Sequence, residues 1–230
     1  MTADIFDFWA GVPGDARVHP ADAPVFARAG REGAEGHGFD LRCLPATFNG
    51  PLRTARVVLL YLSPGWCQRD VDEAETPEGQ DRYLRRRKGD APLDSEADHP
   101  EGYRWWTART KRFGEPYKLR DKVAYLNIGP YHSQSFKDYP MLAALPSCRV
   151  SLDWAQGVLF PQAERGERVV ICMRSARYWG LGKQRRYGEG LFAPAVTISG
   201  HMAEKGENMA VRDDVVTAAR AALARGPFEG

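Results

Sequence analysis

The chain has few cysteines and no long apolar run, and its first residues do not lead us to expect a secretory signal. Its four cysteines among 230 residues are widely spaced and form no Cys-x-x-Cys pair, so neither a zinc ribbon nor a disulfide framework is indicated. No apolar run approaches the roughly 20 residues that span a bilayer. The first ten residues are acidic and aromatic rather than basic and then apolar. We therefore expect a cytoplasmic protein with no membrane partner, and the sequence indicates no protein partner.

Several catalytic and cofactor motifs are also missing. No Gly-x-Gly-x-x-Gly turn, no Gly-Lys-Ser/Thr loop and no Gly-x-Ser-x-Gly elbow follows a candidate strand. Among the candidate ligands His99, His132 and His201, no two lie at the spacing of a helical or hairpin metal site. We therefore expect no cofactor and no metal.

The composition is that of one soluble globular domain. Hydrophobic residues make up 43% of the chain and charged residues 27%, which indicates a packed core rather than disorder. Residues 1–50 are rich in Gly, Ala, Pro and Asp. We expect them to form an irregular lead-in that packs on a domain formed by residues 51–230.

Four short apolar runs predict buried strands, and each ends at a turn or a polar loop. The runs cover residues 57–62, 122–127, 168–173 and 193–198. Uninterrupted apolar runs of this length are typical of strands covered on both faces, as in parallel sheets. The carboxyl ends of such strands are where α/β proteins bind ligands. We therefore expect these four loops to converge on a site.

Helical patterns alternate with the strands. They cover residues 103–112, 151–164 and 212–225, whereas the polar stretch 68–99 is expected to be a long loop. Alternating strands and helices predict an α/β fold with three layers (αβα) and a central parallel sheet of about four strands. No internal repeat is present.

Two segments combine basic and aromatic residues. Residues 168–188 hold six Lys or Arg and no Asp or Glu, and residues 82–120 hold eleven against six. Basic groups interleaved with aromatic rings suit phosphate contact and base stacking, although a solvated basic face has the same composition. Trp105 and Trp106 cannot both face the core from one helix, so an exposed Trp would favour binding. The candidate nucleic-acid contacts are Arg104, Arg109, Arg174, Arg177 and Lys183.

Taken in order, the strand-end loops resemble those of the uracil-DNA glycosylase superfamily. Ser63-Pro64-Gly65 occupies the place of the family's water-activating loop, Asn127 ends the second strand, and His201 lies in the last loop. Gly-Tyr-Arg-Trp-Trp at 102–106 and Pro-Tyr-His-Ser at 130–133 are similar to stretches in a poorly characterised branch of that superfamily. The resemblance covers roughly residues 52–205.

The resemblance implies a role for each of these residues. The Ser63 loop would hold the attacking water, and His201 would stabilise charge on the departing base. The Asn127 amide would read the hydrogen-bonding edge of a flipped base. Candidates to stack on that base are Trp66, Tyr131 and His132.

The chain also departs from the family at three positions. Ser63 stands where active members have Asp or Asn, Tyr61 replaces the first Gly of the loop, and Met202 replaces the Pro after the histidine. A serine cannot act as a base at neutral pH. The structural alternatives are a turn role for Ser63, backbone pairing for Asn127 and an ordinary turn for His201.

We therefore expect a DNA-binding protein that recognises a base, with hydrolysis of the N-glycosidic bond as its candidate reaction. One alternative is a catalytically inactive nucleic-acid-binding domain that has lost the water-activating residue. Another is an enzyme acting on a small nucleoside or nucleotide, in which Arg174, Arg177 and Lys183 would hold a phosphate.

Overall fold

The computed structural model describes residues 4–29, 37–136, 139–195 and 209–229. The chain forms two compact units, and each is built from three separate segments. The first unit comprises Met1–Phe48, Leu62–Lys88 and Asn127–Trp154. The second unit comprises Asn49–Tyr61, Gly89–Leu126 and Ala155–Gly230. The loops that follow the first two predicted strands therefore belong to the first unit, whereas the strands themselves lie in the second.

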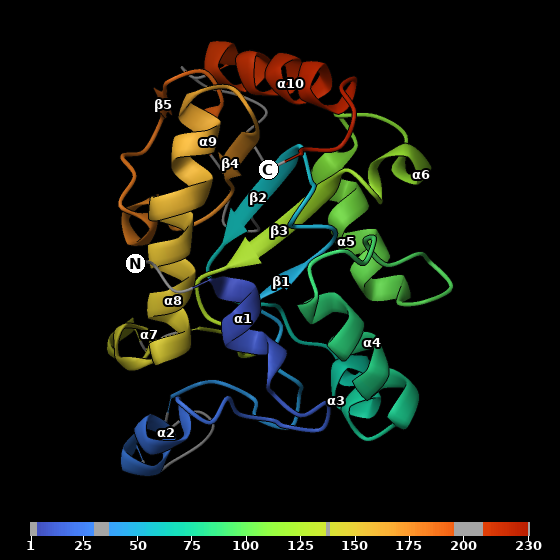
Figure 1. The fold of residues 1–230 in the computed structure, drawn as a ribbon, viewed down its shortest axis with the longest axis vertical. Coiled ribbons are helices and arrows are strands. Elements are labelled where there is room, and N and C mark those ends of the chain that lie inside the picture. The colour runs from blue at the N-terminus through green and yellow to red at the C-terminus, as the bar shows by residue number, and fades with distance from the viewer. Residues whose placement is uncertain (1–3, 30–36, 137–138, 196–208, 230) are drawn as a thin grey trace. The chain divides into compact units, whose positions relative to one another are not determined.

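A six-stranded sheet forms the centre of the fold, with the order β1-β3-β2-β4-β6-β5 (Figure 1). Its strands are β1 (Phe48–Asn49), β2 (Val57–Tyr61), β3 (Val123–Asn127), β4 (Val169–Cys172), β5 (Arg185–Tyr187) and β6 (Leu191–Ala193). β4 pairs in parallel with both β2 and β6. The prediction of an α/β fold is confirmed.

The prediction of a purely parallel sheet of about four strands is wrong, because β5 and β6 pair antiparallel. The three residues between them form a tight turn in which Gly188 has a φ of +54°, a conformation that glycine adopts without steric cost. The turn places β6 at Leu191–Ala193, ahead of the run predicted over 193–198. Residues 196–198 of that run lie outside the described residues.

Both faces of the sheet are buried, as the apolar runs predict. Val57, Leu59 and Tyr61 of β2 point to one face, because successive strand residues alternate. Trp106 of α5 (Pro100–Thr110) and Val215 of α10 (Met209–Leu223) pack in the same cluster. Val58 and Leu60 on the opposite face are also fully buried, and α9 (Phe160–Glu164) contacts β4 and β6.

The prediction of a long loop over residues 68–99 is wrong, because this stretch contains two helices of the first unit. These are α3 (Gln68–Ala74) and α4 (Pro77–Arg87). The Thr76 side chain accepts from the Gly79 N–H at 3.1 Å and caps α4, and Pro77 occupies the first turn, where its missing N–H costs nothing. Arg85, Arg86 and Arg87 end the helix, where the helix dipole favours cations.

The remaining helices are short. The first unit has α1 (Ile5–Ala10), α2 (Ala23–Ala29), α7 (Tyr139–Ala144) and α8 (Pro146–Trp154). The second unit has α6 (Pro116–Leu119), the π-helical turn η1 (Ala155–Leu159) and the 3-10 turn η2 (Ala176–Trp179). The π turn η1 ends at Leu159, two residues before Pro161 of α9. Proline has no N–H to continue α-helical bonding. Within the described residues, no helix has both the length and the apolarity to cross a membrane.

Substituting Gly188 with Ala tests the turn that makes the sheet mixed. A Cβ there would lie 2.3 Å from the Glu164 carbonyl oxygen, and the left-handed backbone costs a non-glycine residue about 1–2 kcal/mol. We expect Gly188→Ala to lower the free energy of unfolding by at least about 1 kcal/mol, measured by urea denaturation. Gly226→Ala is the control, since a Cβ at Gly226 would meet nothing within 4 Å. Equal stability of the two variants would contradict this turn.

Candidate functional site

The loops that follow β2 and β3 lie together in the first unit. The Gly129 N–H donates to the Leu62 carbonyl at 2.9 Å, and the Ser133 N–H donates to the Pro64 carbonyl at 3.3 Å. In Figure 1 the arrows of β2 and β3 point the same way, which brings their carboxyl ends to one end of the sheet. Two of the four predicted loops therefore meet.

Ser63 and Trp66 are predicted site residues of this loop pair that are partly exposed. Ser63 directly precedes Pro64 and is half-buried. The Trp66 indole N–H donates to the Asp40 carboxylate at 2.8 Å. Hydrogen bonds from Arg42 hold the pKa of Asp40 below its usual value, so this carboxylate is charged at neutral pH. Trp66 is therefore fixed by its polar edge.

Asn127 is 2% exposed, and it forms backbone pairs rather than facing an open site. Its side-chain amide donates to the Ala46 carbonyl at 3.0 Å. Its own N–H donates to the Thr47 carbonyl at 2.7 Å. Reading a base with the amide donor would require breaking the bond to Ala46. Asn127 therefore pairs with backbone groups, which is the structural alternative to a role in reading a base.

Tyr131 is also buried, and its hydroxyl joins two segments of the first unit. It donates to the Asp22 carboxylate at 2.6 Å and accepts from the His19 N–H at 3.1 Å. Burial raises the pKa of Tyr131, and the Asp22 charge raises it further, so the phenol stays protonated. Asp22 also accepts from the Ser147 N–H at 3.0 Å. The Tyr131 ring thus has no exposed face for a base.

His132 lies between two loops of the first unit. Its Nδ1 lies 2.7 Å from the Gly65 carbonyl oxygen and 3.4 Å from the Asp70 carboxylate. Asp70 also accepts from the Cys67 N–H at 2.9 Å and from its thiol at 3.2 Å. Burial and the Asp70 charge raise the pKa of Cys67 to about 12, so this thiol is not a nucleophile at neutral pH.

The second unit brings together two of the predicted DNA contacts. Arg109 lies over the ring of Trp105 with its guanidinium carbon 4.2 Å from the ring centroid, and it donates to the Trp105 carbonyl at 2.8 Å. Burial lowers the pKa of Arg109, Tyr61 raises it, and the like charge of Arg174 lowers it further. Arg109 therefore stacks on an indole and lies within electrostatic range of a second guanidinium group; Trp105, Arg109 and Arg174 are here called the arginine–tryptophan surface.

The two neighbouring tryptophans differ in burial, as the geometry of a single helix requires. Trp106 is 2% exposed, and its indole donates to the Asp94 carbonyl at 3.0 Å. Trp105 is only partly buried, with Tyr61 and Tyr125 at ring-centroid distances of 4.9 Å and 5.1 Å. Trp105 is therefore the more exposed of the two tryptophans, although it packs against the hydrophobic core cluster.

The other predicted phosphate contacts are exposed side chains of the second unit. Arg104 forms a surface ion pair with Glu101 at 3.2 Å. Arg177 donates to the Tyr178 hydroxyl at 2.5 Å, and Lys183 is exposed. Ser175, between Arg174 and the turn η2, has a φ of +60°. Such strained backbone in a non-glycine residue is frequent at functional sites. His201 lies outside the described residues.

Sequence reasoning missed the carboxylates that fix the loops of the first unit. Asp22, Asp40 and Asp70 each bind a predicted site residue, namely Tyr131, Trp66 and His132. No local signal marks them, because their partners are distant in sequence. It also missed Arg87, which is 7% exposed. The signal for Arg87 was Tyr83, four residues earlier and on the same helical face.

No family model, curated protein or solved structure matches this chain. The fold and the site alone therefore define the structural class of this protein. It is an α/β protein with a six-stranded mixed sheet, a pair of interlocked strand-end loops and an arginine–tryptophan surface.

Removing the Tyr131 hydroxyl tests its structural role. Tyr131→Phe leaves a carboxylate oxygen of Asp22 and the His19 N–H without this partner, which costs about 1–3 kcal/mol. We expect the urea midpoint to fall accordingly. Tyr117→Phe removes a hydroxyl from a side chain that is 71% exposed and should leave the midpoint unchanged. A Tyr131→Phe protein as stable as the unmodified chain would contradict this role.

Proposed function

We propose that this chain recognises a base in DNA through the arginine–tryptophan surface of the second unit. The observation that carries the proposal is the stacking of Arg109 on a partly exposed Trp105, within electrostatic range of the guanidinium group of Arg174. Neighbouring guanidinium groups repel each other, and a phosphate beside them would relieve that repulsion. Aromatic and guanidinium planes stack on bases of any sequence.

Two further observations support the proposal. Arg174 follows the end of β4 after Met173, and Tyr61 ends β2, which is the edge where α/β proteins bind ligands. The ordered resemblance of the strand-end loops to the uracil-DNA glycosylase superfamily points to the same class of ligand. The α/β architecture agrees with that resemblance at the level of fold class only.

The salt dependence of DNA binding tests the proposal. A variant that neutralises one phosphate fewer has a shallower slope of log K against log salt, by roughly 0.7–0.9. We expect Arg174→Gln to weaken binding to labelled single- and double-stranded oligonucleotides and to reduce the slope by about that amount. Fluorescence anisotropy across a salt series measures both quantities.

Arg165→Gln is the matched control. It removes the same charge from the second unit, but Arg165 is already paired with Glu167 at 2.6 Å. An equal reduction of the slope in both variants would show a general charge effect and contradict the proposed surface. Salt-insensitive binding of a mononucleotide, without binding of DNA, would instead favour the enzyme acting on a small nucleotide.

Hydrolysis of the N-glycosidic bond is the second candidate function. The observation that favours it is that Ser63 is partly exposed in a loop bonded to the loop after β3. Against it, the Asn127 amide is bonded to Ala46. The catalytically inactive binder, which the burial of Asn127 favours, would bind DNA without cleaving it.

Cleavage of labelled oligonucleotides containing uracil, hypoxanthine or xanthine tests hydrolysis directly. If the chain hydrolyses the bond, Ser63→Ala and His201→Ala should each lower the rate about 100-fold or more while leaving DNA binding intact, because both remove groups that act in the transition state. Binding without cleavage on every substrate would favour the inactive binder.

A further inference from the structure

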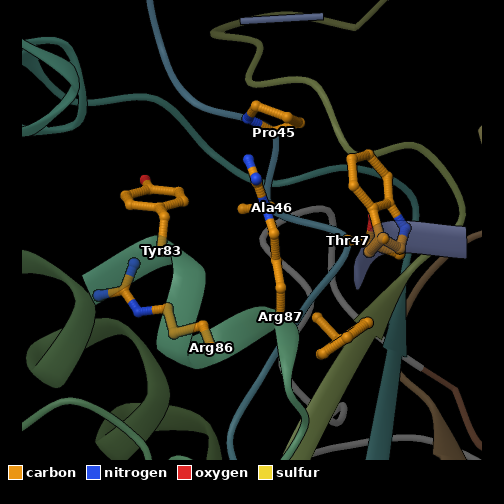
Figure 2. A pocket seen from close by; sticks show the side chains of 8 residues that line it. Pro45, Ala46, Thr47, Tyr83, Arg86 and Arg87 are labelled. Atoms are coloured by element: carbon orange, nitrogen blue, oxygen red, sulfur yellow. The ribbon is translucent and has the colours of Figure 1, made fainter. Parts of the chain in front are cut away.

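A small pocket in the first unit is lined by residues from α1, α4 and the segment that leads into β1 (Figure 2). Its lining residues are Trp9, Pro45, Ala46, Thr47, Phe48, Tyr83, Arg86 and Arg87. Figure 2 shows the Arg87 side chain rising between Tyr83 and Thr47 toward Ala46. None of the residues predicted to form the site lines this pocket.

Arg87 is a buried cation whose charge is not neutralised within the described part of the chain. It is 7% exposed, and its Nη1 donates to the carbonyls of Val12 at 3.1 Å and Pro13 at 3.0 Å. The ring of Trp9 lies 5.7 Å from its guanidinium carbon. No carboxylate of the described residues pairs with it. Burial lowers the pKa of Arg87 to about 10, so it remains charged at neutral pH, and an unpaired buried charge is costly.

The unused donors of Arg87 lie on one edge of its guanidinium group. Nε and Nη2 are both buried, and neither has a hydrogen-bond partner among the described residues. These two N–H groups are parallel and form the fork that binds the two oxygens of a carboxylate or a phosphate. A buried fork without a partner is therefore preorganised for an oxyanion.

Two further polar groups of the pocket lack partners. The Trp9 indole Nε1 and the Thr47 hydroxyl are buried and make no hydrogen bond within the described part of the chain. Each can donate one hydrogen bond, and the indole can only donate. Buried polar groups are almost always satisfied in native proteins, so four unused donors around one cavity indicate a missing acceptor.

The second arginine of the pocket has a different environment. Arg86 lies with its guanidinium carbon 4.8 Å from the ring centroid of Tyr83, and Figure 2 shows it turned toward that ring. Arg86 therefore adds positive charge beside the pocket, whereas Arg87 supplies the fork.

The size of the pocket restricts the ligand. The cavity volume is about 10 Å³, close to what one water requires. We propose that this pocket receives one oxygen of a small oxyanion such as a carboxylate, held by the N–H groups of Arg87 and by hydrogen bonds from Trp9 and Thr47. The proposal goes beyond DNA recognition and uses none of the residues of the arginine–tryptophan surface.

Anion-dependent thermal stability of the full chain tests this proposal. Formate and acetate are the probes, with chloride and inorganic phosphate as comparators at matched ionic strength. A ligand that binds only the folded state raises the unfolding midpoint as its concentration rises. We expect formate to raise the midpoint most.

Arg87→Lys keeps the charge but removes the fork. We expect it to weaken formate binding about ten-fold or more, because one ammonium group replaces two parallel N–H donors. Arg85→Gln on the same helix is the matched control, since Arg85 pairs with Asp81 on the surface and should leave formate binding unchanged.

If the Arg87→Lys variant does not fold, formate binding by a Thr47→Val variant tests the same pocket. It removes an unpaired buried hydroxyl at nearly constant volume, so without anion the variant should be at least as stable as the unmodified chain. Formate binding should weaken roughly five-fold, the effect of losing one hydrogen bond.

Four outcomes would overturn the proposal. No stabilisation by formate would mean that the pocket holds only water, and equal stabilisation of the Arg87→Lys variant would mean that formate binds elsewhere. Chloride as effective as formate would exclude recognition by the fork. Phosphate more effective than formate would exclude a ligand of carboxylate size. None of these outcomes bears on DNA binding, which is measured separately.

Discussion

The hydrogen bond from the Asn127 amide to the Ala46 carbonyl is the constraint on which much of the first unit depends. The Asn127 N–H bonds to the Thr47 carbonyl, and the Ala46 N–H bonds to the Pro130 carbonyl, both at 2.7 Å. These three bonds join the segment leading into β1 to the loop that follows β3. The same segment, Pro45 to Phe48, lines the proposed anion pocket. An unpaired buried amide would cost about 1–3 kcal/mol, so Asn127 fixes the pocket wall.

Carboxylates and arginines play different parts in this chain: the carboxylates fix loops, and the arginines form the two proposed binding sites. In the first unit, buried or half-buried carboxylates such as Asp22 and Asp70 are saturated by hydrogen bonds, and they fix the loops in place. Arg87 is the reverse case, because its Nε–Nη2 edge has no acceptor within the described part of the chain. In the second unit, the like charge of Arg174 lies close enough to Arg109 to lower its pKa. Both proposed sites carry positive charge, and both are therefore proposed to take an anionic ligand.

Much of the fold could be predicted from local pattern, whereas the site could not. The apolar runs over residues 57–62 and 122–127 predicted the central strands, because a strand buried on both faces has a continuous run of hydrophobic residues. The hairpin at Gly188 and the helices within residues 68–99 were missed, since a short edge strand and polar helices carry weak signals. The prediction that either Trp105 or Trp106 must lie outside the core followed from helical geometry alone. The burial of Asn127 and Tyr131 depends on distant partners, Ala46 and Asp22, that no local pattern indicates.

The central proposal is that nucleic acid binds the arginine–tryptophan surface. Hydrogen–deuterium exchange of the full chain, with and without a saturating single-stranded oligonucleotide, tests this binding most directly, because bound segments exchange more slowly. We predict slower exchange in α5, which carries Trp105 and Arg109, and in the segment from Arg174 through η2. Unchanged exchange in both segments when the oligonucleotide is bound would contradict the proposed surface.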